Sequence, residues 1–401
     1  MDVVIGQTLA LMVIAIFVAI VARRLSLPYT VGLVLAGAAL AVSRYDTGIH
    51  LTHDIIFDII LPPLLFEAAI NIPWHELRRD VIPVLVLSIF GVVISALVVS
   101  LGMTWFLGWP FASALVFGVL IAATDPVAVI AMFKDTGLGG RLRLLVESES
   151  LFNDGVAAVL FGLALVWAQG QTGSTLHAGW ALVTIAGGGV VLGLAMGGLG
   201  ILVAGRTGDH MVEAAVTGVG AYGAFLAAEH LHVSGVLATV SAGLLMGSVG
   251  IRGSAAKFGL SVQGRAFVLE MWEFAAFIAN SLVFLLIGLA VAHVSFEQVG
   301  WGALAAAVAL VLVGRAATVY PLSLLFARSR WKIPVPEQHV LWWGGLRGAL
   351  ALALALALPS NLPLRNEIVI ASFAVVAFSV LIQGLTMTPF MRRLGLLSSS
   401  G

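Results

Sequence analysis

The sequence predicts an all-α polytopic membrane protein, organised as a single transmembrane domain over residues 1–401. Three observations support this fold class. The chain is 60% hydrophobic and only 10% charged, whereas about a quarter of the residues of a soluble domain are charged. Apolar runs of about 20 residues, long enough to cross a bilayer core, follow one another along the chain. The basic residues fall mostly in alternate connections between these runs.

Thirteen apolar runs fit the chain best, and the connections between them are too short for a soluble regulatory domain. The first run lacks the basic start and the cleavage site of a signal peptide, so it is interpreted as a span. The 45 glycines suit the close approach of helices in a membrane. The predicted spans are about 3–22, 28–43, 53–73, 82–108, 111–134, 142–169, 178–204, 211–230, 233–250, 266–292, 299–326, 338–359 and 366–391.

The distribution of basic residues predicts the orientation of the chain. When the connections are assigned alternately to two sides, sixteen of the 20 basic residues fall on one side and only Arg44 and Arg365 on the other. Lys and Arg concentrate in cytoplasmic loops. We therefore expect a multi-pass protein of the cell membrane, inner or plasma, with the N-terminus outside and the C-terminus in the cytoplasm. The net charge of zero argues against nucleic acid as a partner.

Two predicted spans carry an aspartate near their centres, Asp125 in the fifth and Asp154 in the sixth. A charge at the bilayer centre costs ~3 kcal/mol on insertion scales and indicates a functional site. Ser150 and Asp154 are four residues apart, as are Glu149 and Asn153, so these side chains lie on neighbouring stripes of one helical face. Carboxylates beside hydroxyl and amide oxygens suit a hard monovalent cation or a proton. They do not suit zinc, because no histidine or cysteine is nearby.

Pro126 directly follows Asp125 and predicts a break in the fifth span. Proline has no N–H to donate, and its ring clashes with the carbonyl four residues earlier, here that of Ala122. The residue before a proline is also pushed away from helical angles. We therefore expect the helix to break at Thr124–Asp125, with freed carbonyl oxygens beside the carboxylate. Secondary transporters use such broken helices to offer backbone oxygens to an ion.

The stretch GGLRG at 344–348 interrupts the twelfth span in a similar way. The fifth and twelfth spans are seven apart in order, so they run in opposite directions. This arrangement predicts two inverted repeats, about 1–170 and 211–395, with a linker span at about 178–204. Each repeat then contributes one broken, crossing helix.

A buried carboxylate site can exchange two ions. Burial disfavours the charged form of a carboxylate and a bound cation favours it, so a proton and a cation compete for one position. Competition at a site that opens alternately to two sides produces exchange. Asp154 is interpreted as the shared carrier of proton and cation, and no cofactor is expected.

Other classes of protein stay open at this point. Two aspartates that share a proton also form the site of a membrane-embedded aspartyl protease. An ion channel or a non-transporting sensor could use the same fold. A structural role is an alternative for every buried charge, and for Glu67 it is as good as a role in ion access. Glu273 is expected to lie near water, and Asn280, Ser281 and Gln383 are expected to form hydrogen bonds between helices.

Six ordered motifs resemble those of the monovalent cation:proton antiporter-1 family, the bacterial NhaP-type and animal NHE-type sodium/proton exchangers. The resemblance extends over nearly the whole chain. The motifs are ATDPVAV at 123–129, ESESLFNDG at 147–155, EFAAFIANSLVFLLIGL at 273–289, GRAATVYPL at 314–322, GGLRGALA at 344–351 and LIQGLTMTP at 381–389.

The resemblance implies exchange of a monovalent cation for a proton, with Na⁺ favoured and Li⁺ or K⁺ as alternatives. It implies a homodimer in the lipid bilayer, in which each subunit has a six-helix core domain beside a dimerisation domain. The core domain would carry the ion by elevator-type alternating access. The adjacent Asn153 and Asp154 are similar to the electroneutral branch of the family, which exchanges one cation for one proton.

The resemblance also implies roles for single residues. Asn153 would gate or orient Asp154, and Glu149 would pair with Arg315 as a structural bridge. Arg347 would compensate partial charges where the broken helices cross. The cation ligands would be Asp154, Asp125, Ser150, the backbone oxygen of Thr124 and, through water, Glu67.

Overall fold

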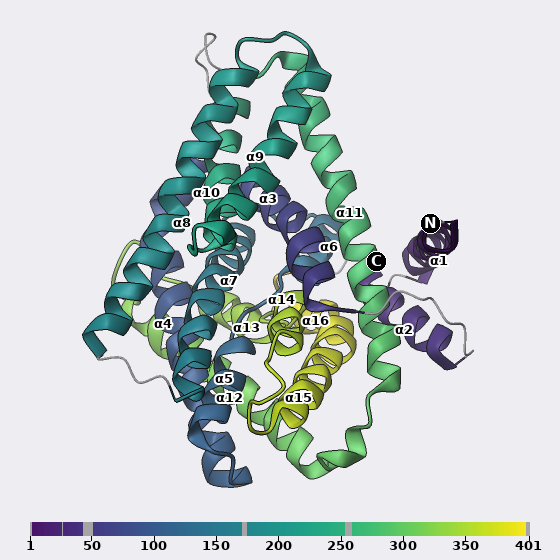
Figure 1. The fold of residues 1–401 in the computed structure, drawn as a ribbon, viewed down its shortest axis with the longest axis vertical. Coiled ribbons are helices and arrows are strands. Elements are labelled where there is room, and N and C mark those ends of the chain that lie inside the picture. Colours follow the sequence, from purple (N-terminus) through teal and green to yellow (C-terminus); the bar gives the residue numbers. More distant parts are fainter. Residues whose placement is uncertain (1, 26, 43–50, 171–174, 253–258, 398–401) are drawn as a thin grey trace.

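The computed structural model describes residues 2–25, 27–42, 51–170, 175–252 and 259–397, and every regular element in these ranges is helical (Figure 1). The first half contains α1 (Asp2–Leu25), α2 (Tyr29–Val42), the π-helix η1 (Ile55–Ile60), α3 (Leu61–Asn71), α4 (Trp74–Leu107), α5 (Phe111–Leu120), α6 (Val127–Thr136), α7 (Arg141–Ala168) and α8 (Thr175–Ala204). The second half contains α9 (His210–His230), α10 (Gly235–Leu245), the π-helix η2 (Met246–Ile251), α11 (Val262–His293), the 3₁₀-helix η3 (Phe296–Gln298), α12 (Trp301–Leu325), α13 (Val335–Trp343), α14 (Ala349–Leu356), α15 (Arg365–Phe378), the π-helix η4 (Ser379–Gln383) and α16 (Gly384–Arg393).

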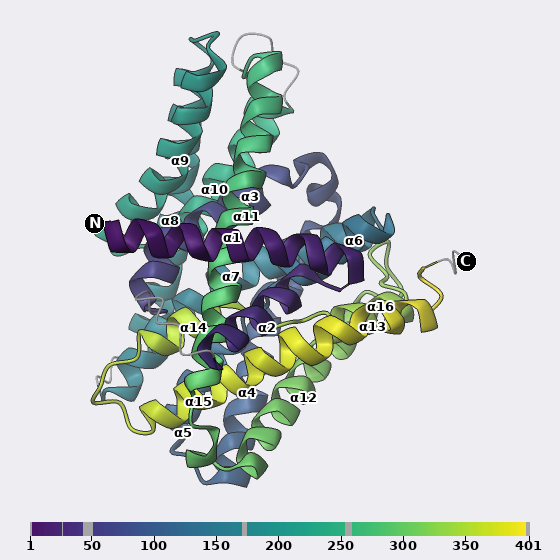
Figure 2. The ribbon, with the colours of Figure 1, turned by 90° about the vertical axis from the view of Figure 1, so that its right-hand side faces the viewer.

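Each predicted span overlaps a helix, or two or three helical segments that follow one another. The all-helical, multi-span fold class is therefore confirmed, while the count of thirteen spans and the inverted repeats stay predictions. α15, η4 and α16 form one continuous rod that ends near the C-terminus (Figure 2). Within the described ranges, seven helices are long and apolar enough to cross a membrane unaided: Trp74–Leu107, Arg141–Ala168, Gly179–Ala204, His210–His230, Val262–His293, Trp301–Leu325 and Arg365–Arg393.

The boundary of α4 differs from the prediction. The helix begins at Trp74, directly after the extended Pro73, whereas the hydropathy places the start at about 82. Helical hydrogen bonds continue through the polar stretch at 78–80, because backbone pairing does not depend on the polarity of the side chains. Hydropathy therefore locates the apolar part of a helix, but not the polar turns that extend the helix beyond it.

The helices pack in two groups. In the first, α4 lies against α5, α7 and α12, and α12 also lies against α13 and α15. In the second, α10 lies against α3, α8 and α9, and α11 lies against α2, α3 and α9. α2 and α11 approach closely because a Cβ atom on Gly37 would overlap the backbone oxygen of Leu285, and one on Gly288 would overlap that of Val34. Both interrupted helices belong to the first group.

Candidate ion-binding site

The two predicted breaks are present, and they meet beside each other in the structure. α5 ends at Leu120 and α6 begins at Val127, while α13 ends at Trp343 and α14 begins at Ala349. The backbone N–H of Asp125 donates to the carbonyl oxygen of Leu346 at 2.8 Å. The two non-helical segments, 121–126 and 344–348, are therefore joined directly by a backbone hydrogen bond.

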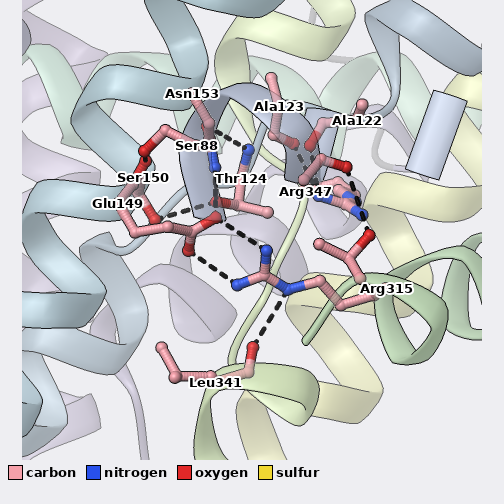
Figure 3. A network of polar contacts seen from close by, with 12 residues as sticks. Ser88, Ala122, Ala123, Thr124, Glu149, Ser150, Asn153, Arg315, Leu341 and Arg347 are labelled. Carbon is pink, nitrogen blue, oxygen red and sulfur yellow. Dashed lines mark hydrogen bonds and ion pairs between the residues drawn. The ribbon is translucent and has the colours of Figure 1, made fainter. Parts of the chain in front are cut away.

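Arg347 binds the end of α5 (Figure 3). Its side chain is 1% exposed, and one guanidinium nitrogen, Nη1, donates to the carbonyl oxygens of Ala122 at 2.9 Å and Ala123 at 3.0 Å. These oxygens lack helical partners because the chain breaks there. The positive guanidinium thus lies at the negative end of a short helix, where a cation is electrostatically favoured.

Asp125 lies at the beginning of both half-helices that leave the crossing. Its Oδ1 accepts the backbone N–H of Val127, the first residue of α6, at 2.9 Å. A Cβ atom on Gly348, the residue before α14, would overlap the Asp125 carboxyl group, so the backbone approaches the carboxylate closely there. Helix N-termini favour negative charge, and the structure places one carboxylate at two of them.

Thr124 is held by side chains from α7 (Figure 3). Its backbone N–H donates to Oδ1 of Asn153 at 3.1 Å, and its hydroxyl accepts from Nδ2 of Asn153 at 2.6 Å. The hydroxyls of Thr124 and Ser150 are 2.9 Å apart. Nδ2 of Asn153 also donates to Oε1 of Glu149 at 3.0 Å. The hydrogen bonds of Asn153 therefore go to the break and to Glu149, not to the neighbouring Asp154.

Glu149 and Arg315 form a bidentate ion pair between α7 and α12. The distances are 2.8 Å from Nη1 to Oε1 and 2.7 Å from Nη2 to Oε2, and the two residues are 1% and 6% exposed. Nε of Arg315 donates to the carbonyl oxygen of Leu341 at 3.1 Å, and Ser88 donates to the backbone oxygen of Glu149 at 3.0 Å. Each charge is thus neutralised and hydrogen-bonded inside the helix group, as a buried pair requires.

Asp154 has a different environment. It projects from α7 into a cavity of about 420 Å³ that Thr124, Asp125 and Glu67 also line. Within the described part of the chain, no hydrogen bond or ion pair involves the Asp154 carboxylate. Its charged neighbours are Asp125, Glu149 and Arg347. A carboxylate that faces open space without a protein partner is free to accept a proton or to ligate a cation.

The cavity lies between the two helix groups. α6, α7 and α14 form one wall, and α3 and α11 form the other. Glu67 is on the α3 wall, where its Oε1 accepts a hydrogen bond from Nδ2 of Asn71 at 2.8 Å. Charged residues occupy another part of the lining, where Lys134 of α6 forms an ion pair with Glu273 of α11 at 3.2 Å. Arg143 and Glu147 of α7 line the same cavity.

The predicted site residues thus separate into two sets. Asp154, Asp125, Thr124 and Glu67 line the cavity, and their oxygens are hard ligands suited to a monovalent cation. The other set lies in the packed network beside the cavity and consists of Glu149, Ser150, Asn153, Arg315 and Arg347. The described residues hold no cluster of three or more His, Cys, Asp or Glu with the geometry of a multivalent metal site.

Sequence reasoning missed some contributors to the site. Ser88 and the carbonyl of Leu341 support the ion pair, but no spacing links them to positions 149 or 315. Gly348 is part of a glycine-rich motif whose interruption was predicted, but its close contact with Asp125 was not. Glu147 lies one helical turn before Ser150 in the motif ESESLFNDG, and helical periodicity could have placed it on the wall that carries Asp154.

Two broken helices that cross beside paired carboxylates in a multi-span helical membrane protein define a secondary ion transporter. The family model described as "Sodium/hydrogen exchanger, transmembrane" matches residues 11–393. The chain therefore belongs to the sodium/hydrogen exchanger family, a family of transporters, not of enzymes.

Three similar curated proteins are described as Na(+)/H(+) antiporters. ApNhaP of Aphanothece halophytica is 42% identical over 374 residues, which cover 92% of this chain and 70% of that protein. NhaP of Pseudomonas aeruginosa is 37% identical over 355 residues, or 85% of this chain and 81% of that protein. NhaH of Halobacillus aidingensis is 33% identical over 409 residues, or 97% of this chain and 98% of that protein.

A solved structure supports the fold. The sodium proton antiporter MjNhaP1 from Methanocaldococcus jannaschii superposes with a TM-score of 0.77 over 98% of both chains. The sequence identity is 18%, so this comparison concerns the arrangement of the helices.

Proposed function

We propose that this chain is a secondary antiporter that exchanges Na⁺ for H⁺ across the membrane, with both ions competing for one site at Asp154 and Asp125. The observation that carries this proposal is the pair of aspartates on one cavity at the crossing of two broken helices. Family membership and relatives described as Na(+)/H(+) antiporters agree with it. Li⁺ and K⁺ are alternative cations, since their ligand chemistry is the same.

The exchange follows from the chemistry of the site. Asp154 faces the cavity without a protein partner, so its charge is neutralised by whichever cation enters, a proton or a metal ion. Asp125, Thr124 and, through water, Glu67 supply further oxygens from the same lining. Two cations at one carboxylate repel each other at low dielectric, so binding of one releases the other. Ser150 enters this scheme through its contact with the Thr124 hydroxyl.

The proposal also assigns different roles to the residues around the break. Glu149, Arg315 and Arg347 hold the structure, because each is buried with protein partners. Asn153 acts on the site by holding Thr124, which lines the cavity, at the break. A neutral asparagine beside Asp154 leaves a single titrating group in the pair, which favours the exchange of one cation for one proton.

The transport cycle is proposed to be an elevator. The cavity separates two helix groups that have dense internal contacts, so movement of one group past the other would carry Asp154 between the two membrane faces. The group with α1–α3 and α8–α11 would form the dimer contact. The basic residues favour an N-terminus outside and a C-terminus in the cytoplasm, so that the Lys134 end of the cavity opens inward.

The experiment is ion-driven pH change in liposomes. The purified chain is reconstituted with a trapped pH dye, and pulses of Na⁺, Li⁺ and K⁺ are applied with and without a potassium/valinomycin clamp. Asp154→Asn is expected to abolish cation-driven alkalinisation. Glu297→Gln removes an exposed carboxylate away from the cavity and is the matched control, expected to behave like wild type.

The outcomes separate the classes of protein. Alkalinisation that does not depend on the membrane potential and is lost in Asp154→Asn supports electroneutral exchange. The cation that produces it is then the transported ion. Single-channel currents in planar bilayers would instead favour a channel. The absence of a response to any cation over a wide pH range would overturn the antiporter proposal, and peptide cleavage lost in Asp125→Asn would replace it with a protease.

A further inference from the structure

One face of α11 lines the ion cavity. The residues on it are spaced by three, four, seven and eight positions, which is the spacing of a single helical stripe. Two of them are polar, Glu273 and Asn280, and the aromatic Phe277 lies between them. The lining residues of α11 are Leu269, Glu273, Ala276, Phe277 and Asn280.

Asn280 has an unusual position for a polar side chain. Its Oδ1 is buried and has no hydrogen-bond partner within the described part of the chain. The interhelical hydrogen bond that we predicted for Asn280 is therefore not formed by this oxygen. A buried amide oxygen without a partner loses the hydrogen bonds that it makes in water, which is unfavourable. That cost is removed whenever a ligand in the cavity binds to the oxygen.

The neighbours of Asn280 fix the rotation of α11. The hydroxyl of Ser281 lies 2.6 Å from that of Tyr29 on α2, and it also contacts the backbone oxygen of Phe277. The Tyr29 and Phe277 rings stack with their centroids 5.5 Å apart. Because Ser281 is held against α2, Asn280 is about 100° away around the helix, where it is among the residues that line the cavity.

Asn280 and Asp154 hold equivalent positions along their helices. Glu147 and Asp154 are seven residues apart on α7, as are Glu273 and Asn280 on α11, and all four line the cavity. Lys134 forms an ion pair with Glu273 and is also a charged neighbour of Glu147. Glu147 on α7 and Glu273 on α11 therefore both lie at the Lys134 end of the cavity. Seven residues rise by about 10.5 Å in either helix. Asn280 therefore faces the region of Asp154 from the opposite wall.

We propose that the side-chain oxygen of Asn280 is a further ligand of the transported cation, supplied by α11 while the cavity is open. This inference rests on the proposed exchange and extends its ligand set across both helix groups. An amide oxygen is a hard, neutral ligand, so it favours a metal cation without adding a second titrating group. Because Asn280 and Asp154 are in different groups, this ligand is lost when the groups move apart.

The test measures Na⁺-driven exchange of Asn280→Ala and Asn280→Leu in oriented proteoliposomes. Both variants remove the oxygen, and Leu keeps the side-chain size, so at least one folded variant is expected. We expect the KM for Na⁺ added on the cavity side to rise about tenfold, equivalent to ~1.4 kcal/mol, with a nearly unchanged maximal rate. The KM from the other side should change less, and the preference between Na⁺ and Li⁺ should shift.

Two controls separate ligation from packing. Asn280→Gln keeps an amide oxygen and should retain most of the Na⁺ affinity. Phe274→Leu changes an exposed side chain of the same helix that does not line the cavity, and it should leave the KM for Na⁺ near its wild-type value. A KM that stays unchanged in both Asn280→Ala and Asn280→Leu overturns the inference, as does an equal rise in Phe274→Leu. If wild type itself shows no exchange, the proposed function fails and this inference fails with it.

Discussion

Two carboxylates on α7, five residues apart, have opposite environments. Glu149 is enclosed by α4, α7 and α12, where both of its oxygens bind the Arg315 guanidinium. Asp154 faces the cavity and has no hydrogen bond or ion pair to any described residue. Five residues turn the helix by about 140°, which is enough to move a side chain from one environment to the other.

This contrast separates structural from functional charge. A buried charge with a full set of protein partners has no capacity left for an ion, and its removal leaves the partner unpaired. A carboxylate that faces a cavity has no partner to lose, and its charge must be balanced by something that enters. Hydropathy alone places Glu149 and Asp154 in one class, whereas their partners place them in two.

The largest expected difference is between Glu149→Gln and Asp154→Asn. Glu149→Gln leaves the Arg315 charge buried and unpaired, and it should lower the free energy of unfolding by about 3–5 kcal/mol. Asp154→Asn should abolish transport and leave the stability near that of wild type. Thermal unfolding in detergent, measured beside liposome transport, checks both. Equal loss of stability in the two variants would contradict the contrast.

The next prediction concerns the ion pair as a unit. Replacing both partners, as in Glu149→Met with Arg315→Met, removes the unpaired charge that each single change leaves. Buried pairs can often be exchanged for apolar residues at no net cost, so the double variant should recover most of the ~3–5 kcal/mol lost in Glu149→Gln. The unfolding transition of the two singles and the double forms a thermodynamic cycle. Simple addition of the two losses would show that the residues do not act as a pair.

Gly348→Ala tests whether the close approach of the backbone to Asp125, at the cavity, is required. The new methyl group would overlap the Asp125 carboxyl group and push the half-helices apart. Overpacking of this kind costs about 1–3 kcal/mol, and we also expect a clear loss of transport because Asp125 must move. Gly302→Ala is a suitable control, because a Cβ atom there meets nothing within 4 Å. Normal transport by Gly348→Ala would show that the close contact is not required.

The smallest effect is expected at the charged end of the cavity. Lys134 and Glu273 join the two helix groups, but their side chains are 47% and 66% exposed. Exposed pairs contribute about 0–1 kcal/mol, so Lys134→Gln should barely change the stability. A modest change in the KM for Na⁺ that fades with added salt is expected instead, because salt screens exposed charges. A salt-independent effect would argue against an electrostatic cause.

Several features of the fold follow from local properties of the sequence. The apolar runs predicted where the helices lie, because a segment in lipid must satisfy its own backbone hydrogen bonds. Pro126 predicted the first break, and GGLRG at 344–348 predicted the second, since proline and glycine act on the backbone of their own neighbourhood. The π-helical segments at 55–60, 246–251 and 379–383 had no signal in the hydropathy.

The candidate site likewise has features that the sequence predicted and features that it could not predict. Helical spacing placed Glu149, Ser150, Asn153 and Asp154 near one another on α7, and the resemblance to a family suggested Arg315 as a partner. No local pattern could show that Asn153 binds Thr124, because the two residues are 29 positions apart and belong to different helical segments. The interhelical hydrogen bond predicted for Asn280 likewise depended on the rotation of α11, which Tyr29 fixes from a distant part of the chain.

The sequence by itself therefore determined the class of protein, the positions of the helices and the two interruptions, because each depends on residues within a few turns of one another. Only the tertiary structure decided which carboxylate is neutralised and which one faces the cavity. Arg315 is 166 residues from Glu149, and the wall opposite Asp154 comes from α3 and α11. Such pairings are set by the packing of helices that are distant in the sequence. Helical periodicity predicts on which face of its helix a side chain lies, but not which residues that face contacts.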